Sequence, residues 1–477
     1  MTNTRKIAHN TIIQIVGKII SVALGLLALG MMTRYLGQER FGWYITTIAF
    51  LQFIYILIDF GLIPVTSQMM SEPHLEKNRL FQNLLAFRLV SAGVFLLIAP
   101  AIALFFPYPI EIKIAISFTT LSFLGVCLNQ IFIGFLQTKL KMHIQAIGEI
   151  AGRIVLVLGL WLMIYKQAGF LPIMAVVVLN SLAYTFVLIL GSKKYIKVGL
   201  KFDKKVWKEI IKKMWPIAIS IIFNVVYLKG DTLILSIYKT QSEVGVYGAA
   251  YRVIDILAQT AMMLMGVLLP LLAFHWSRQQ KQEFKKHYQL AFDSMMLLSV
   301  PMMFGTIVLA DKIMAVVAGN DFAISGKPLQ ILAIAVWGVF LGAVFGHTAV
   351  AINRQKNTIW VYLSNAIITL IGYLIFIPKF GMYGAAWMTV FSELYAGFML
   401  WIVIKKYSKE KLQLKTFGKI TISSITMASV LFYLPKLNIF FAVLLGIAIY
   451  TLMIILLKTI SKETIKEIIS IKKSENL

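Results

Sequence analysis

The sequence predicts an all-α integral membrane protein with about 14 transmembrane helices. Of its 477 residues, 59% are hydrophobic and only 14% are charged, whereas a soluble domain averages about 45–50% apolar and about 25% charged residues. Apolar runs of about 20 residues, long enough to cross the hydrocarbon core, recur along the chain between short polar breaks. This composition excludes a soluble enzyme and a disordered chain. Cys127 is the only cysteine, so an intrachain disulfide scaffold is excluded as well.

The apolar runs define the predicted spans, and the polar breaks set their ends. The spans are 10–32, 43–63, 81–106, 112–136, 144–165, 169–191, 214–238, 245–274, 288–310, 328–352, 357–378, 382–404, 418–434 and 437–457. The first span is interpreted as retained, because no small-residue cleavage site follows it. The last two spans are the closest pair in the sequence.

The positions of Lys and Arg predict that both termini face the cytoplasm. Of the 46 Lys and Arg residues, 32 fall on the side of the N-terminus, nine on the opposite side and five inside spans. Short cytoplasmic loops carry an excess of these residues, so we expect an even number of spans in the cytoplasmic (plasma) membrane. Most of the net charge of +26 is then a topological signal facing anionic lipid, and no nucleic-acid partner is expected.

A lysine-rich break divides the chain into two halves. Residues 192–213 are predicted to form a basic cytoplasmic amphipathic linker, with Val206, Trp207, Ile210 and Ile211 on one face of a surface helix. The other predicted parts are an N-terminal six-helix lobe (1–191), a C-terminal six-helix lobe (214–404), two trailing helices (405–458) and a basic cytoplasmic tail (459–477).

Weak internal similarity favours the same two-half design. Residues 39–44 (ERFGWY) resemble residues 243–247 (EVGVY), and residues 245–250 (GVYGAA) resemble residues 381–386 (GMYGAA). Such repeats are common in transporters, which bind substrate between the halves. Close packing of membrane helices also selects small residues, so both interpretations stay open.

Ionisable residues inside the spans are the candidates for function. A charge at the bilayer centre costs at least ~2.5–3.5 kcal/mol, so each residue needs a partner or a wet cavity. The basic residues are Lys18, Arg88, Arg153, Lys229 and Arg252, and the acidic candidates are Asp59, Glu149, Asp231, Asp255 and Glu393. Spacing allows Glu149 to pair with Arg153, and Arg252 with Asp255.

These residues support two kinds of interpretation. A set of cations in a wet cavity suits an anionic substrate such as a diphosphate, and the carboxylates are candidates for coupling to H⁺ or Na⁺. Alternatively, Lys18 and Arg88 snorkel to the membrane surface, and the two spaced pairs are structural. No nucleotide-binding loop, zinc motif or catalytic triad is recognised, so no metal, cofactor or enzymatic activity is expected.

Three groups of stretches resemble a known family. They are residues 5–8 with Asn10, 33–42 and 59–62; residues 229–236, 243–247 and 251–252; and residues 351–355, 377–378 and 381–386. The chain resembles the bacterial and archaeal polysaccharide flippases of the multidrug/oligosaccharidyl-lipid/polysaccharide exporter superfamily. The resemblance implies two six-helix lobes around a central cavity, with two trailing helices. It also implies export of a polyprenyl-diphosphate-linked oligosaccharide by alternating access.

The resemblance also implies a role for basic residues in binding the diphosphate. In related flippases cavity arginines have this role, which falls here on Arg34, Arg88, Arg153, Lys229 and Arg252. Arg34, Lys229 and Arg252 lie in the matching stretches. Lys18, a sixth candidate, is assigned like Arg88 and Arg153 from its position in a span.

Three other functions stay open at this point. One is a multidrug or cation antiporter of the same fold, and another is a peptidoglycan lipid-precursor flippase. The third is a membrane glycan polymerase, but the longest exterior loop, near 311–327, is short and has no His or Arg. The expected partners are a lipid-linked oligosaccharide, membrane lipids and other glycan-assembly proteins.

Overall fold

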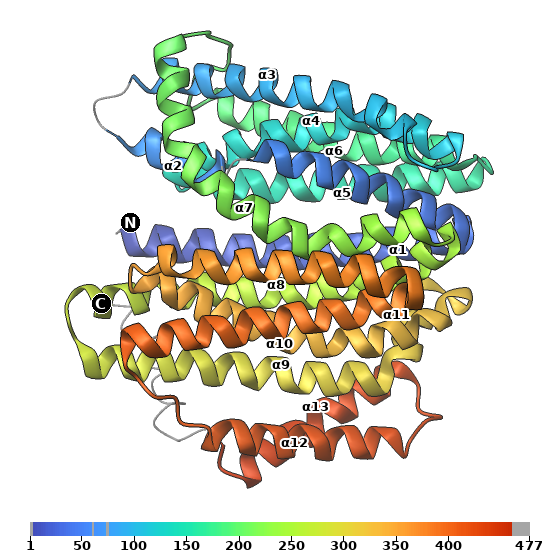
Figure 1. Cartoon of the computed structure of the whole chain (residues 1–477), viewed down its shortest axis with the longest axis vertical. Helices are drawn as coiled ribbons and strands as arrows, with labels where there is room; N and C mark the ends of the chain where they lie inside the picture. The colour runs from blue at the N-terminus through green and yellow to red at the C-terminus, as the bar shows by residue number, and fades with distance from the viewer. Residues whose placement is uncertain (1–2, 60–61, 73–75, 460–477) are drawn as a thin grey trace. The chain divides into compact units, whose positions relative to one another are not determined.

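The computed structural model describes residues 3–59, 62–72 and 76–459 and is helical almost throughout (Figure 1). These residues form 13 α helices, two short 3-10 helices and no strand. Ten of the helices are long and apolar enough to cross a membrane. The prediction of an all-α, multi-pass membrane protein is therefore confirmed. The chain divides into two compact units, Met1–Gly245 and Val246–Leu477.

The first unit contains seven helices and the start of an eighth. They are α1 (Asn3–Asp59), α2 (Leu62–Ser71), α3 (Lys77–Leu104), α4 (Ile110–Thr138), α5 (Met142–Tyr165), α6 (Phe170–Lys193) and α7 (Lys204–Tyr238). The unit ends within α8 (Gln241–Ser277). The predicted lobe boundaries at 191 and 214 stay a prediction.

Helix α1 contains the first predicted span and most of the second. Its 57 residues would extend about 86 Å as one straight helix, far more than a bilayer needs. Gly37, with φ 67° and ψ 179°, divides it into two helical halves. This conformation is open to glycine and strained for other residues. One glycine therefore makes the turn between two spans.

The second unit contains the remaining helices. They are α8, α9 (Lys281–Ala318), η1 (Asn320–Ser325), α10 (Gly326–Ala351), η2 (Gln355–Thr358), α11 (Ile359–Ser408), α12 (Lys415–Phe432) and α13 (Ile439–Leu456). The trailing helix α12 packs on α9 and α13, where Leu309, Met427, Leu431 and Ala442 form a small apolar core.

Helix α11 is a helical hairpin that contains two predicted spans. Gly381, with φ 57° and ψ −136°, divides its 50 residues. The Asn365 amide donates to the Ser392 carbonyl oxygen (3.1 Å), and the Tyr373 hydroxyl lies 3.1 Å from Thr389 Oγ1. These contacts join residues before Gly381 to residues after it, so the two halves of α11 lie side by side. Each of the 14 predicted spans overlaps a helix of the structure, although the second span also includes residues 60–61, which lie outside the described residues.

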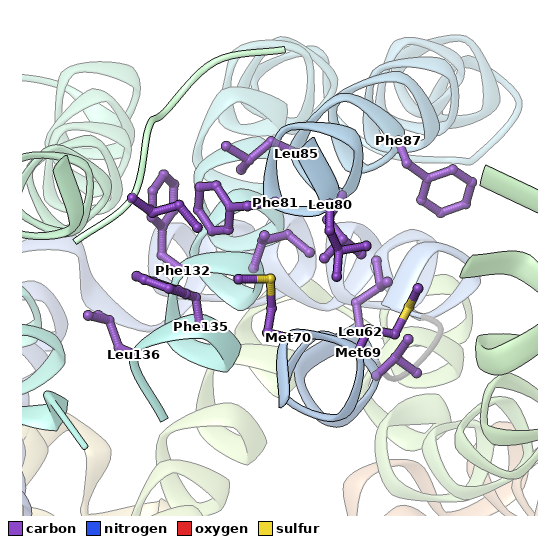
Figure 2. Packing of buried hydrophobic residues seen from close by; sticks show 14 of the residues in the cluster. Leu62, Met69, Met70, Leu80, Phe81, Leu85, Phe87, Phe132, Phe135 and Leu136 are labelled. Atoms are coloured by element: carbon purple, nitrogen blue, oxygen red, sulfur yellow. The ribbon is translucent and has the colours of Figure 1, made fainter. Parts of the chain in front are cut away.

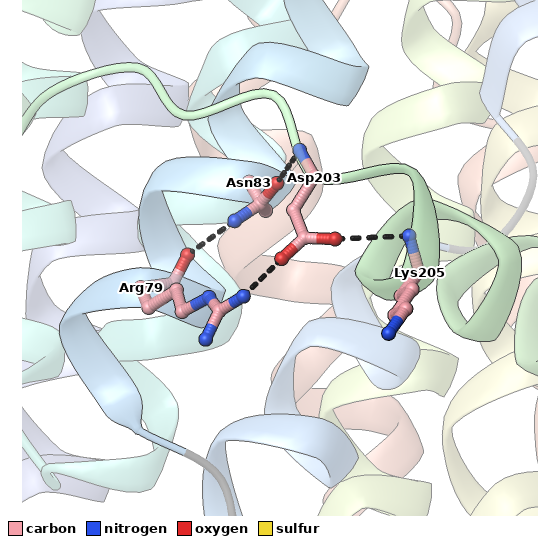
Figure 3. Close-up of polar contacts among 4 residues, drawn as sticks. All are labelled: Arg79, Asn83, Asp203 and Lys205. Carbon is pink, nitrogen blue, oxygen red and sulfur yellow. Dashed lines mark hydrogen bonds and ion pairs between the residues drawn. The ribbon is translucent and has the colours of Figure 1, made fainter.

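The linker is not the surface helix that the sequence predicts. Residues 194–203 are not helical, and α7 then runs without a break from Lys204 into the seventh predicted span. Asp203 caps α7 by accepting a hydrogen bond from the Lys205 amide (2.9 Å). It also binds Arg79 of α3, while its own amide donates to Asn83 (2.8 Å) (Figure 3). The Arg79 hydrogen bond lowers the pKa of Asp203.

The apolar face of the linker packs on protein. Ile210 is buried, and Val206 and Trp207 pack on the core formed by α2, α3 and α4. Trp207 meets Phe87 edge to face at 5.5 Å. Figure 2 shows the centre of this core, where Phe81 lies among apolar side chains of neighbouring helices. Val206, Trp207 and Ile210 of the predicted apolar face therefore pack on the rest of the first unit rather than on lipid, whereas Ile211 is exposed.

Candidate functional site

Three of the predicted site residues come together between α1 and α5. The Lys18 ammonium lies 3.0 Å from Glu149 Oε1, and Ser21 Oγ donates to the same oxygen (2.8 Å). Arg153 lies one turn along α5 from Glu149, and its guanidinium lies against Gly25 of α1. We call Lys18, Ser21, Glu149 and Arg153 the α1–α5 polar cluster.

The sequence places these four side chains on facing sides of two helices. Positions 18 and 21 share a face of α1, as do positions 149 and 153 of α5. Small residues bring the helices close, because a Cβ at Gly17 would lie 2.7 Å from the Cβ of Ala146. The ion pair therefore forms between helices, and Glu149 binds Lys18 rather than Arg153.

Arg153 is the notable member of the cluster. It lies midway along α5, is half-buried, and has no hydrogen-bond or ion-pair partner among the described residues. A Cβ at Gly25 would lie 3.7 Å from its Cζ. Counted by formal charge, the cluster has two basic side chains and one acidic one, so one positive charge at mid-helix is not compensated within it.

Arg88 occupies a separate and enclosed site. Its side chain is completely buried; its Nε donates to the Cys127 carbonyl oxygen (3.2 Å), and its guanidinium also binds Gln130. Gln130 donates to the Tyr55 hydroxyl, and the Tyr55 ring centroid is 5.9 Å from Arg88 Cζ. The snorkelling alternative for Arg88 is therefore wrong. Its role in substrate binding stays a prediction.

Lys229 and Asp231 lie near the end of α7. Asp231 is completely buried, and its Oδ1 accepts from the Thr232 amide (2.6 Å) and hydroxyl (3.2 Å). Lys229 is half-buried. Further along, Ser236 Oγ lies 2.8 Å from the Tyr108 hydroxyl, and burial raises the pKa of Tyr108 to about 12. These side chains make the end of α7 polar inside the first unit.

Two predicted residues of the first unit lie outside these groups. Arg34 is exposed near the turn at Gly37, and its Nη1 donates to the Gly30 carbonyl oxygen of the same helix (3.0 Å). Asp59 is the last residue of α1, and its side chain lies outside the described ones.

The remaining candidates belong to the second unit. Arg252 and Asp255 of α8 form the predicted pair at 3.8 Å, and each side chain is about one-third exposed. Glu393 of α11 is 6% exposed. Gly338 of α10 packs directly on it, because a Cβ there would lie 2.8 Å from the Glu393 Cβ.

Sequence reasoning missed several polar residues beside these candidates. Gln130 and Tyr55 surround Arg88, and Gln145 is hydrogen-bonded to Tyr184, which lies near Glu149. Gln145 lies four residues before Glu149, so the spacing rule used for charged pairs could have found it. The contacts of Gln130 and Tyr55 with Arg88 join different helices and leave no such local signal.

The repeated stretches meet at a close helix crossing inside the first unit. Thr46 Oγ1 donates to Gln241 Oε1 (2.6 Å), and Ser242 Oγ donates to Gln38 Oε1 (2.9 Å). A Cβ at Gly42 would collide with the Gln241 carbonyl group, and one at Gly245 would collide with the Gln38 carbonyl group. At this α1–α8 crossing, formed by these six residues, close packing accounts for both repeated glycines.

Known proteins resemble the chain over most of its length. A family model described as "Polysaccharide biosynthesis protein" matches residues 31–327. The "Probable low-salt glycan biosynthesis flippase Agl15" of Haloferax volcanii is 24% identical over 481 residues, which cover 97% of this chain and 98% of that protein.

Solved structures show the same fold. A lipid II flippase, MurJ, in an inward closed conformation superposes with a TM-score of 0.76 at 18% identity, over 92% of this chain and 97% of that one. An inward-facing multidrug resistance transporter of the MATE family has a TM-score of 0.69 at 11% identity, over 82% and 98% of the two chains. The chain therefore belongs to the polysaccharide biosynthesis protein family, and it has the same fold as these solved transporters.

Proposed function

We propose that the protein flips a polyprenyl-diphosphate-linked oligosaccharide across the cytoplasmic membrane by alternating access. The observation that carries this proposal is Arg153, a half-buried guanidinium midway along a membrane helix with no partner among the described residues. Such a charge is costly unless a ligand or water compensates it. A diphosphate offers oxygen pairs that match the guanidinium fork. The names of the Haloferax volcanii and MurJ relatives support a lipid-linked glycan as the substrate class.

Lys18 supplies a second cation, but Glu149 already binds it. A diphosphate and Glu149 therefore compete for Lys18. Glu149→Gln removes the competitor and changes the formal charge of the cluster from +1 to +2. We expect diphosphate binding to tighten in this variant. An unchanged or weaker affinity contradicts a competing role for Glu149.

The membrane potential is the driving force we propose. With the inside negative, outward movement of each negative charge is favoured by ~2.3 kcal/mol per 100 mV. Coupling to H⁺ or Na⁺ at a carboxylate inside a span is a second candidate driving force, and a flipping assay can separate it from the membrane potential. Collapsing the potential slows flipping on this account, whereas collapsing only a Na⁺ or pH gradient slows it if a carboxylate couples the ion.

Alternating access requires helices to separate on one side of the membrane and then on the other. We propose that the α1–α8 crossing is one contact that opens. The chain has one cysteine, Cys127, so Cys127→Ser gives a cysteine-free background for Gln38→Cys with Ser242→Cys. Cross-linking this pair should stop flipping and reduction should restore it, with single-cysteine variants as controls. Full activity of the cross-linked protein refutes opening at this crossing.

The test of the function itself is transport in proteoliposomes. A fluorescent polyprenyl-diphosphate oligosaccharide should cross the bilayer only when the protein is present, and Arg153→Gln should slow it. Uptake of a cationic dye without movement of several such lipids would instead favour a multidrug antiporter. Cysteine accessibility at the two termini tests the proposed cytoplasmic orientation.

A further inference from the structure

The second unit contains a cavity of about 710 Å³ whose lining includes none of the residues assigned to the substrate. Helices α9, α10, α11 and α12 line it, together with the loop 409–414. Its wall is aromatic and apolar: Phe292, Trp337, Leu341, Phe345, Phe398 and Trp401. The rings of Trp337 and Phe417 stack at 6.1 Å with an interplanar angle of 8°. We call this space the α11–α12 cavity.

The charged lining of the cavity is mainly cationic. Lys405, Glu410 and Lys411 are its charged lining residues, and they lie at or just beyond the end of α11. Residues 405–419 contain six lysines and a single glutamate. The Lys405 ammonium lies 4.9 Å from the centroid of the Trp401 ring. This arrangement combines an apolar interior with a positive rim at the end of a membrane helix, where lipid headgroups lie.

The loop wall of the cavity is held in place by hydrogen bonds. The Gln413 amide donates to Gln289 Oε1 (2.8 Å), and Gln289 Nε2 donates back to the Gln413 carbonyl oxygen (3.0 Å). The Glu410 amide donates to Ser408 Oγ (3.3 Å). These contacts fix both ends of the loop to α9 and α11. A ligand therefore meets a formed wall and does not have to order it on binding.

We propose that the α11–α12 cavity binds an anionic glycerophospholipid of the membrane, with an acyl chain inside and the phosphate between Lys405 and Lys411. A methylene group is about as large as a water molecule, which takes about 30 Å³ of liquid. The cavity thus holds on the order of 20 such groups, enough for one acyl chain. The bound lipid contacts α12 as well as α9, α10 and α11 of the same unit, and so holds these helices together. This role is independent of the proposed function.

The experiment uses the full-length protein in nanodiscs with photoreactive lipids. The probe is a phosphatidylglycerol with a diazirine in its acyl chain, and the matched probe is the same molecule with a choline headgroup. Labelled peptides are mapped by mass spectrometry. The phosphatidylglycerol probe should label the cavity wall around Phe398 and Leu412. Lys405→Gln with Lys411→Gln should weaken labelling up to about 30-fold, since each lysine near an anionic lipid contributes about fivefold.

Two further variants separate a binding effect from a folding effect. Lys356→Gln with Lys379→Gln removes two lysines of the same unit that do not line the cavity and should leave labelling unchanged. Leu414→Glu adds a negative charge at an exposed lining residue and should weaken labelling by phosphatidylglycerol.

Three results would overturn the proposal. Equal labelling by the choline probe would show that the cavity does not select an anionic headgroup. Unchanged labelling in Lys405→Gln with Lys411→Gln would show that these two lysines do not bind the lipid phosphate. Displacement of the probe by an equal amount of polyprenyl phosphate, without displacement by unlabelled phosphatidylglycerol, assigns the cavity to the prenyl chain of the substrate instead.

Discussion

The α1–α5 polar cluster predicts opposite effects for two neighbouring cations. In Lys18→Gln, Ser21 Oγ (2.8 Å) is the remaining hydrogen-bond donor to the Glu149 carboxylate among the contacts described above, so the protein should lose stability. Arg153→Gln removes a charge without a partner among the described residues, so stability should not fall. Arg153→Gln should instead weaken the binding of a diphosphate.

The structure sets the size of both effects. The Lys18 and Glu149 side chains are 36% and 21% exposed, so this ion pair is intermediate between a surface pair and a buried pair. A surface pair contributes ~0.2–1 kcal/mol, and disruption of a buried pair costs ~3–5 kcal/mol. We expect Lys18→Gln to cost ~1–2 kcal/mol. A hydrogen bond to a charged group contributes ~1.5–3 kcal/mol, so Arg153→Gln should weaken diphosphate affinity by roughly 10- to 150-fold.

The assay is a double-mutant cycle with a binding measurement. Melting temperatures of the protein, Lys18→Gln, Glu149→Gln and the double variant are compared in one detergent at one scan rate. The double variant should recover the stability lost in Lys18→Gln, because it no longer contains an unpaired carboxylate. Additive losses in the double variant, or a loss of stability in Arg153→Gln as large as that in Lys18→Gln, would refute the reasoning.

Three further predictions follow from single positions. Arg79 lowers the pKa of Asp203, so the stabilisation by this carboxylate exists above the ordinary pKa of about 3.9 and is lost as the pH falls through the lowered value. The difference in melting temperature between Asp203→Asn and the protein should therefore shrink from neutral pH towards about pH 3, and a constant difference contradicts this. Gly381 has φ 57°, so Gly381→Ala should destabilise the protein by ~1–3 kcal/mol. Gly418 lies in α12 with open space around it, so Gly418→Ala should stabilise the protein by ~0.5–1 kcal/mol. Equal melting temperatures of the two variants would contradict the strain argument. Gly42→Val should slow formation of the engineered disulfide across the α1–α8 crossing, and an unchanged rate would show that the crossing tolerates a side chain.

The spans could be predicted because the bilayer imposes both composition and length on each helix. Hydropathy detects only the apolar part of a helix. It did not predict that α7 begins at Lys204, ten residues before its span, or that α9 extends over Lys281–Ala318. Lysine and glutamine are good helix formers, so these helices continue beyond their apolar parts.

The linker shows a limit of amphipathic patterns. Of the predicted apolar face, Val206, Trp207 and Ile210 pack on the protein and Ile211 does not. An apolar helix face packs equally well on lipid or on protein. The choice depends on the core of α2, α3 and α4, which is distant in sequence. A pattern within 22 residues contains no information about that core.

The candidate site was predicted in part. Spacing correctly placed Glu149 and Arg153 on one helix face and correctly predicted the Arg252–Asp255 pair. It could not predict that Glu149 binds Lys18, because these residues are 131 positions apart. Likewise, the carbonyl and amide partners of Arg88 lie on another helix, and only packing brings them together.

The most direct test of the central claim is a comparison of two lipids in the same proteoliposomes. Both carry one oligosaccharide and one polyprenyl chain, but one has a diphosphate linkage and the other a neutral linkage. We expect that the protein flips the diphosphate lipid, that an inside-negative potential accelerates its outward movement, and that the neutral lipid is flipped poorly. Equal flipping of both lipids, with no effect of Arg153→Gln on either, would contradict recognition through the diphosphate.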